Sequence, residues 1–197
     1  MSDMRNELLT SAEGLIRRRG YSGFSYADLS DRVGIRKASI HYHFPTKEGL
    51  VATVLQTYRD RYMGALHRIE ENFGNALDRI DAYGRLYLIG VDKGLGCLCA
   101  ALSSELEILP VDLRTGTVAF FREHLAWIEK IYQVGRQNAE VNASLDDLQA
   151  ARIVVSSLEG ALMIERLLDG SAGFEITMKA IRTSLSPPIL VNATRAG

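Results

Sequence analysis

The chain has 197 residues, of which 47% are apolar and 24% charged, and its net charge is −1. This composition is ordinary for a soluble globular protein, and the length allows one large domain or a small domain against a larger one. The chain does not start like a signal peptide, no apolar run is long enough to span a membrane, and two cysteines cannot build a disulfide framework. We therefore expect a cytoplasmic protein with no membrane partner.

Charge is distributed unevenly along the sequence. Residues 1–61 contain ten basic and seven acidic side chains, a net charge of +3, whereas the remainder contains thirteen basic and seventeen acidic side chains, a net charge of −4. A polyanionic partner is therefore expected to meet the N-terminal part of the chain.

The first predicted helix has apolar residues at helical spacing from Met4 to Ile16 and ends in Arg17, Arg18 and Arg19 before Gly20. Basic residues in a last turn followed by glycine are a helix stop, since cations suit the negative end of the helix dipole. We interpret these three arginines as that helix end rather than as groups that read bases.

Two short helices follow. Ser25 is the predicted N-cap of the first, with Asp28 three residues later in a capping-box arrangement. Gly34 interrupts that helix, and the next is predicted from about Arg36 to Phe44. Two short helices around a glycine-containing turn are typical of a helix-turn-helix. Pro45 then stops the chain and Thr46 caps a long helix from Lys47 to about Asn72.

The helix from Arg36 to Phe44 has two different faces. Ile40 and Phe44 lie four residues apart and can pack onto the preceding helix. The other side carries Lys37, Ala38, Ser39 and Tyr42, with His41 beside them. Small and hydrogen-bonding residues with a basic start suit a helix that enters the major groove. The following helix starts with Thr46 and Lys47, which offer amide groups and a cation to a phosphate.

The stretch SYADLSDRVGIRKASIHYHFPTKEGL closely resembles the TetR family of transcriptional regulators, and the resemblance covers roughly residues 4–58. In that family a tyrosine that commonly contacts phosphate stands where this chain has His41, so Tyr42 or His41 must take this role. The expected DNA contacts are Ser25, Arg36, Lys37, Ala38, Ser39, His41, Tyr42, His43, Thr46 and Lys47.

The remaining sequence also has helical spacing, so we predict an all-α fold with a DNA-binding domain over residues 1–60 and a helical domain over residues 61–197. No helical pattern continues into the tail that begins at Ser186. Helices of the second domain are predicted at 76–92, 95–109, 112–139, 146–168 and 174–185.

The family resemblance implies that the second domain binds a ligand and that its last two helices form a four-helix bundle with a partner subunit. Small residues in the helix at 146–168 would allow close crossing, although the same stripe could be core within one chain. The expected interface residues are Val154, Leu158, Ala161, Leu162 and Glu165.

Aromatic and flexible apolar side chains could line a ligand pocket, although each alone is more often part of a core. Cys97 and Cys99 would point about 200° apart on one helix, which argues against a chelating pair. We expect a buried structural role for each thiol rather than a sensor role, and neither a metal nor a cofactor. The candidate pocket residues are Tyr83, Tyr87, Cys97, Phe120, Trp127 and Met163.

The function expected from these features is a sequence-specific DNA-binding regulator that binds an inverted-repeat operator as a homodimer and is released by a small molecule. The alternative is a helical protein-interaction module without DNA binding. The sequence lacks a nucleophile elbow, a phosphate loop and a His/Cys set with metal spacing, so an enzyme is not expected.

Overall fold

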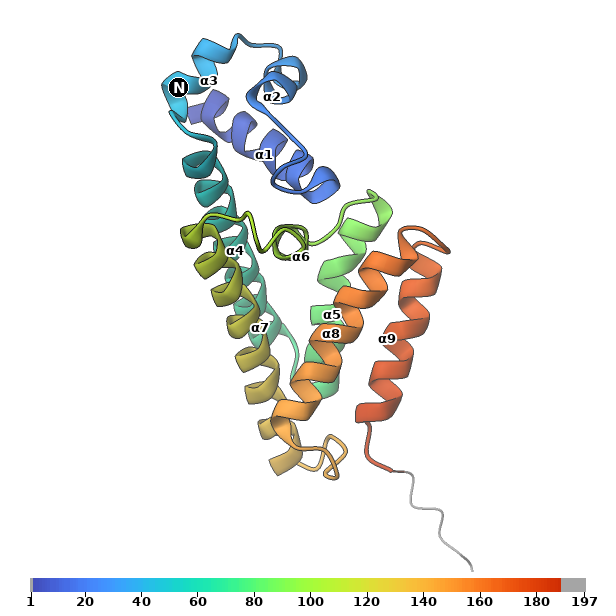
Figure 1. Ribbon diagram of the computed structural model, residues 1–197. Helices are drawn as coiled ribbons and strands as arrows, with labels where there is room; N and C mark the ends of the chain where they lie inside the picture. Colours follow the sequence, from blue (N-terminus) through green and yellow to red (C-terminus); the bar gives the residue numbers. More distant parts are fainter. Residues whose placement is uncertain (1, 189–197) are drawn as a thin grey trace, which may run out of the picture.

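The computed structural model describes residues 2–188, and regular structure in this range consists of nine helices and no strand. The helices form two groups, a small head above a longer body (Figure 1). The all-helical fold class and the N-terminal helix-turn-helix predicted from the sequence are confirmed. Most of the tail expected to lack a helix, residues 189–197, lies outside the described range.

The head is held by the local signals that the sequence contains. Gly20 follows the first helix with φ +79°, a left-handed conformation that glycine adopts without strain. Ser25 caps the second helix through the predicted capping box: its side chain accepts from the amide of Asp28, and its own amide donates to the Asp28 carboxylate at 2.8 Å. The head consists of α1 (Ser2–Arg19), α2 (Tyr26–Val33) and α3 (Lys37–His43).

The turn between α2 and α3 fixes the direction of α3. Gly34 has φ +76° and donates its amide to the Ser30 carbonyl at 2.9 Å, so α2 ends in a left-handed cap. At the other end of α3, the Tyr26 hydroxyl donates to the Phe44 carbonyl at 2.8 Å. The second helix of the motif is therefore anchored to the first at both of its ends.

The body is built on α4, which continues unbroken for 26 residues from the head into the body and runs beside α7 (Figure 1). It starts where predicted, because the Thr46 hydroxyl accepts from the Gly49 amide at 3.1 Å. The last two helices, α8 and α9, lie side by side and pack on each other. The body helices are α4 (Lys47–Asn72), α5 (Ala76–Asp92), α6 (Leu98–Ser103), α7 (Val111–Gln137), α8 (Asp147–Glu165) and α9 (Ser171–Leu185).

The helix predicted at 95–109 is much shorter in the structure, where only Leu98–Ser103 is helical. The segment before it is extended, because Gly96 donates its amide to the Arg17 carbonyl at 3.3 Å and accepts from Arg17 Nε at 2.6 Å. This contact with α1 is remote in sequence, so the local pattern could not indicate it.

Two further polar contacts join the head to the body. The Glu105 carboxylate, just after α6, accepts from the hydroxyl and the amide of Ser22, the latter at 2.9 Å. Glu13 on α1 forms an ion pair with Arg61 on α4 at 2.8 Å. Together with the Arg17–Gly96 pair, these contacts add polar links to the packing of α1 against α4 and α6.

Candidate DNA-binding surface and body core

Helix α3 has the two faces that the sequence predicts. Ile40 is fully buried and Phe44 is 5% exposed, whereas Tyr42 is 72% exposed. Because seven residues cannot form a stable helix alone, α3 depends on this anchoring by its apolar side. Its exposed side chains are Lys37, Ala38, Ser39, His41 and Tyr42, and Arg36 at its N-cap is exposed as well.

The three aromatic residues at the end of α3 are placed differently. The His41 ring packs edge-on against Tyr26 at 4.8 Å between centroids, and its Nδ1 lies 3.3 Å from the Pro45 carbonyl oxygen. His43 is half-buried, with its ring 5.3 Å from that of Tyr42. The family resemblance left Tyr42 and His41 as alternatives for the phosphate contact. Of the two, Tyr42 is the aromatic side chain that is more available to a partner.

Lys47 does not extend freely from the start of α4. Its ammonium donates to the Phe24 carbonyl at 2.6 Å and lies 4.6 Å from the Tyr21 ring centre and 4.5 Å from that of Phe24. Burial lowers the pKa of Lys47 below its ordinary value. Lys47 therefore anchors the loop between α1 and α2 in the structure, and its contact with phosphate stays a prediction.

The hydroxyls of Ser25 and Thr46 are also engaged within the head. Each accepts amide hydrogen bonds at the start of its own helix, and Ser25 donates in addition to Asp28 at 2.6 Å. Both residues are exposed. They therefore cap the two helices that flank α3. On α3 itself, Lys37, Ser39 and Tyr42 are exposed polar side chains that cap no helix.

The body contains a chain of buried polar groups that the sequence reasoning missed. The Tyr83 hydroxyl lies 2.8 Å from His124 Nδ1 and 3.0 Å from the Tyr87 hydroxyl, which in turn donates to Glu159 at 3.3 Å. Burial lowers the pKa of His124 to about 3 and raises the pKa of Glu159 well above its ordinary value. Burial therefore favours the neutral form of both His124 and Glu159. His124 falls four residues after Phe120 on the buried stripe of α7, a spacing that could have indicated it.

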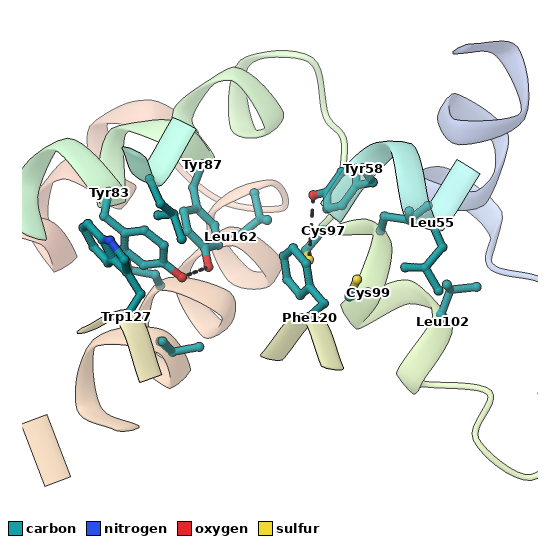
Figure 2. Packing of buried hydrophobic residues seen from close by; sticks show 14 of the residues in the cluster. Leu55, Tyr58, Tyr83, Tyr87, Cys97, Cys99, Leu102, Phe120, Trp127 and Leu162 are labelled. Carbon is teal, nitrogen blue, oxygen red and sulfur yellow. Dashed lines mark hydrogen bonds between the residues drawn. The ribbon is translucent and has the colours of Figure 1, made fainter. Parts of the chain in front are cut away.

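The aromatic residues predicted to line a pocket pack against one another instead. Tyr83 lies 5.6 Å from Tyr87 and 5.7 Å from Trp127 between ring centres, and Figure 2 shows the three together, with Phe120 nearer Cys97. All five of these predicted residues are buried, whereas Met163 is 59% exposed. Met163 lies outside the aromatic cluster but lines a separate cleft of about 260 Å³ together with Cys97, so its role in ligand binding stays a prediction.

Cys97 and Cys99 are both free and buried. Cys97 precedes α6 with extended backbone, so the helical geometry that would separate the two side chains does not apply, and both sulfurs lie in one apolar region (Figure 2). Burial disfavours the Cys97 thiolate, but hydrogen bonds from the Cys99 thiol and the Ala100 amide lower its pKa to about 6. Burial raises the pKa of Cys99. The two thiols are therefore chemically different.

Four of the five residues expected at a subunit interface face the interior of a single chain: Val154, Leu158, Ala161 and Leu162 are at most 5% exposed. Of the two alternatives that the sequence left open for this stripe, the structure shows intrachain core, and only Glu165 stays partly exposed. Exposed apolar side chains of 38% to 84% accessibility lie on α8, in the turn after it and on α9, namely Ile153, Ile164, Leu167, Leu168 and Ile176.

Within residues 2–188, none of the helices combines the length and apolar character needed to cross a bilayer. The same range brings together no group of three His, Cys, Asp or Glu side chains suited to a metal. The site that stands out is the head, where a glycine turn joins two short helices and the second exposes polar groups over a buried apolar side. Such a fold and surface define a helix-turn-helix DNA-binding protein.

Comparison with known proteins narrows this class. Residues 8–54 match the family described as "Bacterial regulatory proteins, tetR family", and residues 76–181 match "Tetracyclin repressor-like, C-terminal domain". The chain therefore belongs to the TetR family, and it is a DNA-binding transcriptional regulator rather than an enzyme.

Individual relatives cover nearly the whole chain. It is 25% identical to the HTH-type transcriptional repressor NemR of Escherichia coli over 190 residues, which cover 94% of this chain and 96% of that protein. A TetR-family regulator from Agrobacterium tumefaciens aligns with a TM-score of 0.89 at 29% identity, covering 94% of this chain and 98% of its own. The reduced form of Escherichia coli NemR aligns with a TM-score of 0.81 at 25% identity, and the alignment covers 95% of this chain and 100% of that chain.

Proposed function

We propose that this protein is a transcriptional repressor that binds an inverted-repeat operator as a homodimer and is released by a small-molecule effector. In this proposal residues 1–60 bind DNA, while residues 61–197 dimerise and respond to the effector. The single observation that carries the proposal is the exposed polar face of α3, with Lys37, Ser39 and Tyr42 outward and Ile40 buried beneath them. Relatives named as repressors support the sign of regulation.

The exposed apolar face of α8 and α9 supports the homodimer. Leu167, in the turn after α8, and Ile176 on α9 are 84% and 68% exposed, and an interface would remove these apolar side chains from water. A two-fold dimer presents two copies of α3, so the operator should contain two inverted half-sites about one helical turn apart or a multiple of it.

The polar contacts between head and body support release by an effector. A ligand that favours a different position of α6 would disturb the pairs Arg17–Gly96 and Ser22–Glu105, and with them the separation of the two recognition helices. Coupling between two such sites is typically about 1–3 kcal/mol and acts equally in both directions.

Selection of binding sequences from random DNA tests the proposal. The wild type should return an inverted repeat, and a Lys37→Ala/Ser39→Ala variant should bind it more weakly with altered half-site preference. An Arg122→Ala variant, which changes an exposed side chain on α7 far from α3 in the sequence, is the matched control and should bind like the wild type. Failure of the wild type to enrich any sequence would instead favour an interaction module without DNA binding.

Sedimentation tests the dimer separately. Ile176→Asp should dissociate it because a carboxylate would enter an apolar interface. Ile108→Asp is the control, since Ile108 is comparably exposed at 61% but lies between α6 and α7. Equal effects of the two variants, or a monomeric wild type, would contradict the assignment of this face.

A further inference from the structure

A cleft of about 620 Å³ lies where the head meets the body. Its walls come from α1 and α2 on the head side and from α4 and α5 on the body side. None of the residues expected to line a ligand pocket contributes to it. A cavity of this volume is within the range that holds small organic molecules.

The cleft concentrates positive charge. One carboxylate, that of Glu13, is present, and it is already paired with Arg17 at 3.1 Å and with Arg61 at 2.8 Å. The whole chain has a net charge of −1, so this excess is a local feature rather than a general one. The cations in the lining are Arg17, Arg18, Arg32, Arg61, Arg68 and Lys93.

Two of these cations converge on one point. A methyl carbon placed on Gly14 would lie 3.5 Å from a terminal nitrogen of both Arg18 and Arg32, so the two guanidiniums approach the same surface of α1. Within residues 2–188 neither forms an ion pair with a carboxylate. Like charges held together repel, and an anion between them would remove the repulsion while accepting several N–H groups.

The body side of the cleft is partly apolar. Ile89 on α5 is 62% exposed although it lies in the lining, and Tyr62, Leu86 and Leu95 are half-buried there. A ligand that covered Ile89 would gain from removal of this apolar surface from water. The cleft therefore has cations on both sides, with Arg61, Arg68 and Lys93 on the body side, and its apolar surface lies at the α5 end.

We propose that this cleft binds an amphipathic organic anion, with its carboxylate or phosphate group between Arg18 and Arg32 and its apolar part against Ile89 and Leu95. The bound anion touches head and body at once, so it holds them in one relative position and changes operator affinity; this second statement rests on the proposed function. DNA itself is a poorer occupant, because α3 lies near the start of α1, whereas the cleft lies along its second half (Figure 1).

Fluorescence titration with 8-anilinonaphthalene-1-sulfonate, an aromatic sulfonate that brightens in apolar sites, tests the binding. N-phenyl-1-naphthylamine, which lacks the sulfonate, is the matched neutral probe. The anionic probe should bind the wild type at least tenfold more tightly than it binds an Arg18→Gln/Arg32→Gln variant, while the neutral probe should not distinguish them. An Arg85→Gln/Arg122→Gln variant, which changes two exposed arginines outside the cleft, should bind the anionic probe like the wild type.

Competition identifies the class of anion. Dodecanoate and dodecyl phosphate should displace the probe, and their order distinguishes a carboxylate from a phosphate ligand, whereas inorganic phosphate alone should not displace it. Probe binding that is unchanged in the Arg18→Gln/Arg32→Gln variant overturns the site. A tenfold loss of operator affinity in that variant without any added anion also overturns the site, since Arg18 and Arg32 would then bind DNA. Operator binding by the wild type is measured in the same series, so failure of the cleft does not resemble failure of the repressor assignment.

Discussion

The recognition helix and the core of the body use polar residues in opposite ways. Helix α3 exposes its polar groups, with Tyr42 72% accessible, and keeps only apolar side chains inside. The body buries a connected chain of polar groups from His124 to Glu159 among aromatic rings. A polar surface leaves its groups free for a partner, whereas hydrogen bonds between buried polar groups favour one packing arrangement. The two regions should therefore respond differently to substitution.

The largest expected effect is on the inner face of α8. Ala161→Arg places an unpaired charge at a position that is 5% exposed, so it should lower the free energy of unfolding by about 4 kcal/mol. Urea unfolding followed by circular dichroism measures this. Gln133→Arg is the control, since Gln133 is exposed on α7 and lies outside the face assigned to the dimer. Equal stability of the two variants would mean that the inner face of α8 has been misplaced.

On the recognition helix the effect should appear in binding and not in stability. Lys37→Ala and Ser39→Ala should each weaken operator binding by about 1–3 kcal/mol, the value of a lost base contact, with an unchanged melting temperature. Fluorescence anisotropy with the selected operator measures the affinity. The control is Thr57→Ala, which changes an exposed side chain on α4. A lower melting temperature in either variant would contradict the exposed position of these side chains.

The buried chain should make stability depend on pH through His124. Its pKa is about 3 in the folded protein and 6.5 by default, so the unfolded chain binds more protons between these values and stability falls as pH decreases. From pH 6.5 to pH 5 the wild type should lose about 2 kcal/mol relative to His124→Gln. Urea midpoints at the two pH values test this difference. Comparison with the variant matters, because the raised pKa of Glu159 contributes the opposite slope above its unfolded pKa. Parallel pH curves would exclude a buried neutral His124.

The smallest expected effect separates Lys47 from a phosphate contact. Lys47→Met should reduce stability by about 1 kcal/mol through loss of its contacts with Tyr21 and Phe24. It should leave the salt dependence of operator binding unchanged, whereas Arg36→Met should reduce the slope by about one per subunit if Arg36 meets phosphate. A reduced salt dependence of operator binding in the Lys47 variant would show that Lys47 contacts a DNA phosphate.

The head could be predicted from sequence because its signals are local. The Ser25 cap with Asp28, Gly34 and the Ile40–Phe44 spacing each act within four residues, so pattern alone indicates them. Lys47 could not be predicted in this way, since its ammonium binds a carbonyl 23 positions away, at Phe24.

The body shows the same limit more strongly. The stripe on α8 has helical spacing, but spacing cannot say whether a partner subunit or the same chain covers it. The short α6 and the half-buried Glu159 depend on contacts with α1 and α5 that are remote in sequence. The burial of His124 could have been predicted from the sequence, because a histidine on an apolar stripe indicates a buried neutral imidazole.

The amide of Gly96 offers a way to observe the junction between head and body directly. Its hydrogen bond to the Arg17 carbonyl crosses from one region to the other, so solvent protons can reach it when the two separate while both remain folded. The exchange rate of this one amide would then report the free energy of that opening. Measured with and without operator DNA, the rate would show how far the junction is strained or relaxed in the DNA-bound state.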